Sequence, residues 1–206
     1  MLIKLQDVIL PEILINISFK EDDPSEGELI LKESAPDSKI KKLHITGLPE
    51  QSLAFTLDHG THKDSKCFKQ LSCYLNPASE KINKSCDLVI VMAAKNTWKV
   101  LILDLKSDKP RLKKTETQLL NSELYVQYLL SLLKYHYDQD ISDVIFQRTI
   151  VTTTRPQKNS VYKPNEGRFK QSAFRSVSVS VKNYEGFVHV GRLFDKIQLV
   201  SKSTRI

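Results

Sequence analysis

Glycine and cysteine are both scarce in this sequence, and each scarcity argues against a class of protein. The six glycines among 206 residues form no glycine-rich phosphate loop and no dinucleotide-binding fingerprint, which disfavours enzymes built on a nucleotide cofactor. Three cysteines, Cys67, Cys73 and Cys86, make an odd count without the framework of a disulfide-rich secreted domain. We therefore expect a protein of the reducing cytoplasm.

Long apolar runs are also missing. No stretch approaches the roughly 18 residues that a membrane-spanning helix needs. The N-terminal segment MLIKLQDVILPEI lacks the charged region, apolar region and small-residue cleavage site of a secretory signal. We expect no membrane partner.

Positive charge is present in excess. The formal net charge is +7 and the pI is near 9.2, which favours a polyanionic partner, with nucleic acid as the first candidate. A surplus of solvated lysines that merely keeps the protein soluble is an equally good explanation of charge alone.

The most informative stretch runs from Cys86 to Ser107, CDLVIVMAAKNTWKVLILDLKS. Two apolar, β-rich runs meet at Lys95-Asn96, which predicts a β-hairpin in which opposed residue numbers sum to about 191. This register places Asp87 opposite Asp104. Because side chains alternate along a strand, Asp104 and Lys106 share a face, and Asp87 joins them there.

Two carboxylates and one lysine at the end of an apolar hairpin suit a particular chemistry. Adjacent carboxylates repel each other unless a cation lies between them, and Mg²⁺ prefers such oxygen ligands. A lysine on the same face can orient a water and offset charge that builds on a phosphate. The alternative is that these are ordinary polar residues at strand ends, or an internal salt bridge.

The clearest helix is predicted over 115–135, with Thr115 as the N-cap. Its solvent-facing stripe is Glu123, Gln127, Ser131 and Lys134. Gln118 falls on the opposite, inward side of the first turn, where an amide needs a partner. If the helix crosses back over the sheet, Gln118 lies near the carboxylates.

The remaining chain is predicted to be rich in strands. Short β-like runs at 12–19, 28–32, 40–46 and 52–57 form an N-terminal meander, and 64–74 contains a short helix. After the long helix, 146–153 forms a strand in a parallel crossover. A C-terminal hairpin pairs 176–182 with 187–193 across a turn at 183–186. We expect one domain over 1–206, divided into a strand-rich extension (1–57), a core (58–154), and a basic loop with the hairpin (155–206).

The order Asp87, then Asp104-Leu105-Lys106, then a helix with Gln118 resembles the PD-(D/E)xK nuclease superfamily over residues 58–154. The resemblance implies an α/β (α+β) fold: a mixed central sheet with an αβββαβ restriction-endonuclease-like core, here flanked by the meander and the hairpin. It implies that Asp87 and Asp104 ligate metal, that Lys106 is the catalytic lysine, and that Gln118 is the polar helix residue. The RecB-type pattern has tyrosine four residues after the glutamine, where this chain has Ser122. The upstream acidic ligand stays open between Asp58, Asp64 and Glu80.

These observations predict an Mg²⁺- or Mn²⁺-dependent endonuclease that acts on nucleic acid, with DNA first. Basic residues that follow the motif, and a basic segment with interleaved aromatics, are the candidate phosphate contacts: Lys109, Arg111, Lys113, Lys114, Arg155, Lys158, Lys163, Arg168 and Lys170. The alternatives are a non-catalytic nucleic-acid-binding module or an interaction subunit of a larger assembly that keeps the nuclease fold. A homodimer is also left open.

Overall fold

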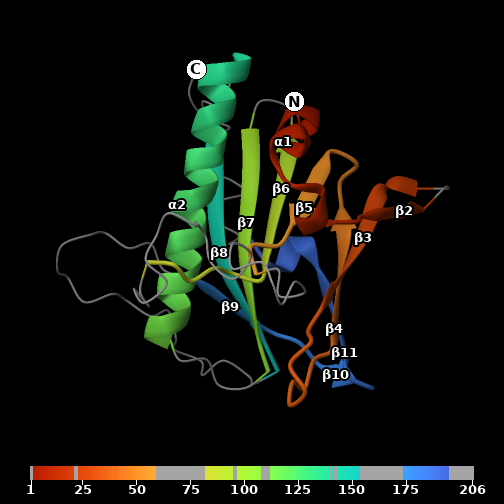
Figure 1. Cartoon of the computed structure of the whole chain (residues 1–206). Coiled ribbons are helices and arrows are strands. Elements are labelled where there is room, and N and C mark those ends of the chain that lie inside the picture. The colour runs from red at the N-terminus through yellow and green to blue at the C-terminus, as the bar shows by residue number, and fades with distance from the viewer. Residues whose placement is uncertain are drawn as a thin grey trace, which may run out of the picture.

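The computed structural model describes residues 2–20, 23–58, 82–94, 97–107, 112–139, 141, 143–153 and 174–194. Over these residues the chain folds into two mixed β-sheets and two α-helices (Figure 1). The predicted mixed α/β class is thereby confirmed at this level. No helix in these ranges is long and apolar enough to cross a membrane.

The larger sheet has the strand order β1-β5-β6-β7-β8-β9. The pairs β1–β5, β5–β6 and β6–β7 are antiparallel, whereas β7–β8 and β8–β9 are parallel. The strands are β1 (Leu14–Ile15), β5 (Ser52–Phe55), β6 (Leu88–Ala94), β7 (Thr97–Lys106), β8 (Val144–Thr152) and β9 (Arg175–Ser178). This sheet therefore takes β1 and β5 from the first 57 residues and β9 from the C-terminal part.

The smaller sheet has the order β10-β11-β4-β3-β2, so it contains strands from the N-terminal and the C-terminal parts of the chain. Its strands are β2 (Ser18–Lys20), β3 (Asp23–Lys32), β4 (Lys42–Leu48), β10 (Val181–Lys182) and β11 (Glu185–His189). Strand β11 lies parallel to β4, in the register that places Phe187 opposite His44. The C-terminal strands thus complete a sheet that the N-terminal strands begin.

The two sheets and the helices form three layers, and the middle sheet is buried on both faces. Leu101, Leu103 and Leu105 of β7 pack against the smaller sheet. The alternate residues of β7, Trp98 and Ile102 among them, pack against α1 (Leu2–Val8) and α2 (Leu112–Tyr137). This double burial explains why β7 is almost continuously apolar, as strands covered on both faces are. Short 3₁₀ helices occur at η1 (Pro11–Ile13) and η3 (Val190–Arg192).

The predicted central hairpin is confirmed with its register. Leu88 pairs with Leu103 and Ala94 with Thr97, so opposed numbers sum to 191 along the whole ladder. The turn at Lys95-Asn96 lies outside the described residues.

The predicted C-terminal hairpin is wrong in its extent. The alternating segment Arg175–Lys182 is divided between the sheets: β9 adds to β8, and β10 pairs with β11 after a break at Val179-Ser180. The turn is tighter than predicted, because only Asn183 and Tyr184 lie between the paired strands, both with positive φ (52° and 62°). Two successive positive φ values are typical of a type I′ hairpin turn.

The helix boundaries also differ from the prediction. Helix α2 begins at Leu112, so Thr115 is a buried interior residue and not the N-cap. The preference of threonine for the N-cap position predicted the later start. The strong helix propensity of leucine and lysine favours the earlier one. The N-terminal helix α1 was not predicted, and the predicted helix at 64–74 lies outside the described residues.

Candidate active site at the end of the central hairpin

The predicted acidic pair lies where β6 begins and β7 ends, on the face that α2 covers. Asp104 continues the row of Val100 and Ile102, and Asp87 continues the row of Val89, all of which pack toward the helices. Asp104 is fully buried, while Asp87 is partly buried. The side chain of Asp87 accepts a hydrogen bond of 2.6 Å from the Leu105 N–H, beyond the last paired residue of β6. The carboxylate thus replaces a strand carbonyl.

Lys106 joins the pair as the sequence predicts. Its Nζ lies 2.8 Å from Asp104 Oδ2, and its side chain is 30% exposed. Neither carboxylate oxygen of Asp104 has a partner with hydrogen-bond geometry. A fully buried carboxylate compensated by one ion pair is costly to maintain, so its other oxygen, Oδ1, has unused capacity to bind a cation.

The protonation behaviour of the cluster follows from burial and like charge. Burial and the charge of Asp104 hold the pKa of Asp87 well above its usual range. Burial also raises the pKa of Asp104, although Lys106 opposes that rise. Desolvation would lower the pKa of Lys106, but the carboxylates of Asp104 and Asp87 outweigh it and raise that pKa. Lys106 therefore carries its positive charge at neutral pH.

Gln118 supports the site through the backbone and does not touch the carboxylates directly. Its Nε2 donates to the Ser85 carbonyl oxygen at 3.0 Å, and its Oε1 is buried without a hydrogen-bond partner. Ser122, one turn later, accepts from the Cys86 N–H at 2.8 Å. Asn121 donates to the Lys84 carbonyl at 3.3 Å. One face of α2 therefore fixes the segment that leads into Asp87.

Cys86, directly before Asp87, is structural. It is fully buried, and burial raises the pKa of its thiol to about 12. Because the thiolate is the reactive form, a thiol with so high a pKa is inert at neutral pH.

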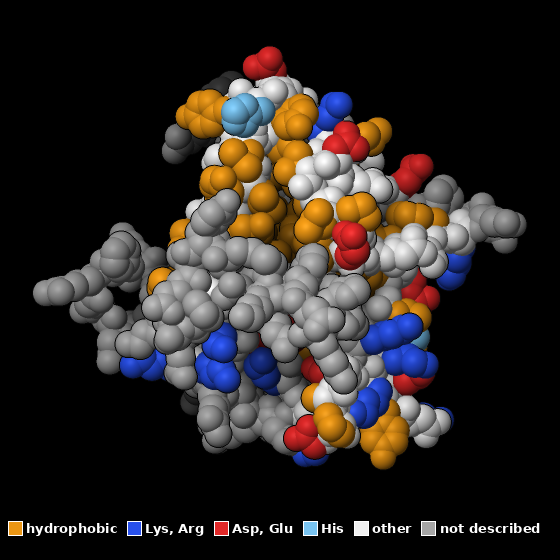
Figure 2. Space-filling model, in the orientation of Figure 1, with side chains coloured by type: hydrophobic (Ala, Val, Ile, Leu, Met, Phe, Trp, Pro, Cys, Tyr) orange, Lys and Arg blue, Asp and Glu red, His pale blue; other side chains and the backbone are white. Residues whose placement is uncertain are grey.

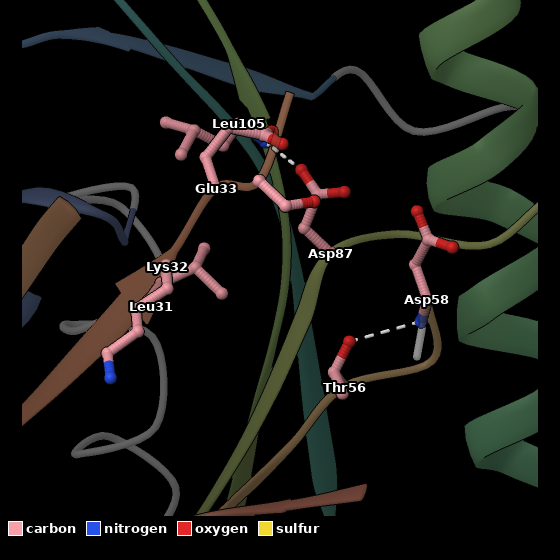
Figure 3. A pocket seen from close by; sticks show the side chains of 8 residues that line it. Leu31, Lys32, Glu33, Thr56, Asp58, Asp87 and Leu105 are labelled. Carbon is pink, nitrogen blue, oxygen red and sulfur yellow. Dashed lines mark hydrogen bonds between the residues drawn. The ribbon is translucent and has the colours of Figure 1, made fainter. Parts of the chain in front are cut away.

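A pocket of about 140 Å³ opens beside Asp87 (Figure 3). Its wall includes Asp58, which follows β5, and Glu33, which follows β3 in the smaller sheet. Burial and the nearby Glu33 carboxylate raise the pKa of Asp58, against the influence of Lys106 and Lys84. Of the three candidates for the upstream acid, Asp58 is therefore at the site, while Asp64 and Glu80 lie outside the described residues.

Glu33 is the site residue that the sequence did not reveal. In Figure 3 its carboxylate and that of Asp87 point toward one another across the pocket. Glu33 is 54 positions from Asp87 and follows a strand of the other, smaller sheet. The only signal in the sequence is a charged residue directly after a strand, which many strands have.

The donor set fits a hard divalent cation only if water supplies part of the coordination. Among the described residues no group of three or more His, Cys, Asp and Glu side chains is arranged to hold a metal ion. Yet Asp87 and Asp104 offer adjacent carboxylates with raised pKa values and unused oxygens. Mg²⁺ commonly binds through one or two carboxylates and keeps several waters, and this arrangement meets that need.

The candidate phosphate contacts are described only in part. Lys113 and Lys114 are exposed in the first turn of α2. Figure 2 shows Lys and Arg side chains on the lower half of one face, the half in which α2 begins and β7 ends in Figure 1. The others lie outside the described residues: Lys109, Arg111, Arg155, Lys158, Lys163, Arg168 and Lys170.

Comparisons of this chain with protein-family models, with curated proteins and with solved structures find no match.

Proposed function

We propose that this protein is a divalent-metal-dependent nuclease that hydrolyses phosphodiester bonds and has a core of the restriction-endonuclease type. DNA is the first candidate substrate. The chain order that supports this core is three antiparallel strands, β5, β6 and β7, then α2 and the parallel strand β8. The observation that carries the proposal is the cluster of Asp87, Lys106 and the fully buried Asp104 at the end of the central hairpin.

Asp87 and Asp104 would hold Mg²⁺ or Mn²⁺ in this mechanism. When bound, such an ion lowers the pKa of a coordinated water and polarises a phosphoryl oxygen. The Leu105 N–H fixes the carboxylate of Asp87 at 2.6 Å, so the ligand is positioned before any cation arrives. Burial of Asp104 excludes water from one side, which strengthens the interaction of a carboxylate with a cation.

Lys106 stabilises charge in the proposed reaction and does not act as a general base. Its pKa is raised by the neighbouring carboxylates, so at neutral pH it has no free electron pair to accept a proton. An ammonium group on the same face offsets the negative charge that grows on the phosphoryl oxygens in the transition state. Gln118 acts through Ser85 as a positioning residue.

Cleavage assays with matched variants test this proposal. Wild type is incubated with supercoiled, linear and single-stranded DNA and with RNA, in Mg²⁺, Mn²⁺ or EDTA. We expect metal-dependent cleavage that falls at least about 100-fold in Asp104→Asn and Lys106→Ala, the loss typical of a removed charge-stabilising group, while DNA binding persists. Lys99→Ala, at the opposite end of the same strand, is the control and should cleave like wild type.

The ion pair between Lys106 and Asp104 also supports a second function, a non-catalytic binding or assembly module. In that case the 2.8 Å contact is a permanent salt bridge that only stabilises the strand end. Wild type that binds DNA but cuts no substrate with either metal would establish the binding module. Wild type that binds neither metal nor nucleic acid would leave only the interaction subunit.

A further inference from the structure

The smaller sheet reaches the candidate active site through the segment that follows β3. Glu33 and Lys32 line the same pocket as Asp58, Asp87 and Leu105 (Figure 3). The pocket therefore lies where the ends of β3, β5, β6 and β7 converge, between strands of both sheets.

The segment after β3 forms hydrogen bonds to Ser107, the residue directly after Lys106. The hydroxyl groups of Ser38 and Ser107 are 2.5 Å apart, and the Lys39 N–H donates to Ser107 Oγ at 3.0 Å. Glu33 itself is held because its Oε1 accepts from the Ala35 N–H at 2.9 Å. The second carboxylate oxygen of Glu33 is then available to the pocket.

The charges around the pocket are unbalanced. Glu33 raises the pKa of both Asp58 and Lys106, so its charge acts on residues at the ends of two different strands. Among the described residues four carboxylates lie at or beside the pocket: Glu33, Asp58, Asp87 and Asp104. The described lysines near them are Lys32, which lines the pocket, and Lys84 and Lys106, which both lower the pKa of Asp58. Asp104 is fully buried and pairs with Lys106 only at Oδ2, which leaves Oδ1 without a partner. Two carboxylates that interact with Asp104, those of Asp87 and Asp58, line the pocket.

The pocket is larger than a bare ion needs. Its volume of about 140 Å³ greatly exceeds the roughly 15 Å³ that one water requires. Among the described residues no group of three or more His, Cys, Asp or Glu side chains is arranged to bind a metal ion directly. Mg²⁺ dehydrates reluctantly and usually keeps several waters, so a pocket of this size lined by carboxylates suits a hydrated ion.

We propose that Glu33, from the smaller sheet, is a positioning residue of the cation site, and that with Asp58 it holds a hydrated divalent cation through the water shell while Asp87 provides a direct carboxylate. This inference rests on the proposed metal-dependent function and deepens it. It also gives the smaller sheet a role in the site, because without that sheet the pocket would lack one acidic wall.

Isothermal titration of metal-free protein with Mn²⁺ tests this inference without an activity assay. We expect Glu33→Gln and Asp58→Asn to weaken Mn²⁺ binding by about 10- to 100-fold, the loss typical of residues that act on a metal through an outer shell. Cobalt(III) hexammine, an exchange-inert complex that offers only outer-sphere contacts, should bind wild type and lose affinity in the same variants. Glu26→Gln, an exposed carboxylate of β3 paired with Lys20 at 3.7 Å, is the control.

The outcomes separate this inference from the function on which it rests. If wild type binds Mn²⁺ and both variants bind it equally well, the role of Glu33 and Asp58 is overturned while the metal-dependent nuclease stands. If wild type binds no Mn²⁺ at millimolar concentration, both are overturned. Circular dichroism establishes that each variant is folded, and Asp58→Asn, which follows a different strand, provides the test should Glu33→Gln not fold.

Discussion

Ionising both Asp87 and Asp104 at neutral pH is unfavourable when no cation is present. Both carboxyl groups are desolvated, and the charge of Asp104 raises the cost of ionising Asp87. Lys106 compensates only one oxygen of Asp104, and the other oxygen is buried without a partner. Such an arrangement is destabilising for the folded protein, which is the usual condition of groups placed for function.

Asp87→Asn should therefore stabilise the metal-free protein. The folded-state pKa of Asp87 is raised, so its contribution to stability is fully present below the unfolded-state pKa and is lost as pH rises through the folded-state value. The asparagine cannot ionise, and its oxygen can still accept from the Leu105 N–H. We expect a gain in the free energy of unfolding of about 1–3 kcal/mol, the range for relieving one poorly compensated buried polar group. Urea denaturation in EDTA measures it.

The pH dependence is the control for this prediction. The gain should be large at pH 8 and small at pH 4, where wild-type Asp87 is protonated. Asp7→Asn, at an exposed ion pair with Lys4 of 3.8 Å, should change stability by less than about 0.5 kcal/mol at both values. A destabilised Asp87→Asn at pH 8 would show that the carboxylate is satisfied and would count against a cation site.

At the residue scale, sequence predicted those site residues that are close together along the hairpin. Asp87, Asp104 and Lys106 follow from a register that strand alternation and one turn determine. Glu33 depends on how the smaller sheet packs on the larger one, and no periodicity in the sequence encodes that contact.

Helix α2 anchors the segment that leads into Asp87 and β6. Gln118, Asn121 and Ser122 bond three consecutive backbone groups, at Ser85, Lys84 and Cys86 respectively. The sequence predicted the inward direction of Gln118, but the partner is a carbonyl and not a carboxylate. Ser122, which stands where the RecB-type pattern has tyrosine, accepts the hydrogen bond from the Cys86 N–H.

Ser122→Ala should destabilise the protein because it leaves the buried Cys86 N–H without an acceptor. The expected loss is about 1–3 kcal/mol in the free energy of unfolding. Ser131→Ala is a closely matched control: both hydroxyls donate to the carbonyl four residues earlier, at 2.9 and 2.8 Å, but Ser131 is exposed and holds no strand. Equal effects of the two substitutions in thermal denaturation would show that Ser122 does not anchor the segment before Asp87.

Helical periodicity predicted the solvent exposure of three of the four residues in the polar stripe of α2 correctly and of one wrongly. Gln127, Ser131 and Lys134 are exposed as predicted. Glu123 is not, since its carboxylate pairs with the buried Arg148 of β8 at 3.0 Å. A helical wheel ranks positions by direction, but it cannot show that a neighbouring strand presents an arginine.

On the scale of the whole molecule, the smaller sheet depends on strands from both ends of the chain. Strand β4 lies between β3 and β11, and its Leu43, Ile45 and Leu48 are fully buried against the larger sheet. The sequence predicted most of these strands as separate runs. It could not assign them to sheets, because alternation specifies which residues share a face and not which strand lies alongside.

Gly47→Ala should lower the free energy of unfolding, because it disturbs the contact between β4 and the end of β11. Gly47 has φ of +75°, and a Cβ there would lie 2.1 Å from the ring of His189, next to η3. Backbone strain of about 1–2 kcal/mol and overpacking of about 1–3 kcal/mol should both reduce the free energy of unfolding. The double variant Gly47→Ala, His189→Ala should recover the overpacking part. A cycle with no coupling energy would contradict the close contact.

The central claim is that Asp87 and Asp104 share a divalent cation at the end of the hairpin. Anomalous diffraction from crystals soaked in Mn²⁺ tests it most directly, because the signal locates the ion itself. We predict a peak within about 2–2.6 Å of an oxygen of Asp87 or Asp104, adjoining the pocket that Glu33 and Asp58 line. Crystals at millimolar Mn²⁺ with no peak there, and with Lys106 still paired to Asp104, would contradict the claim.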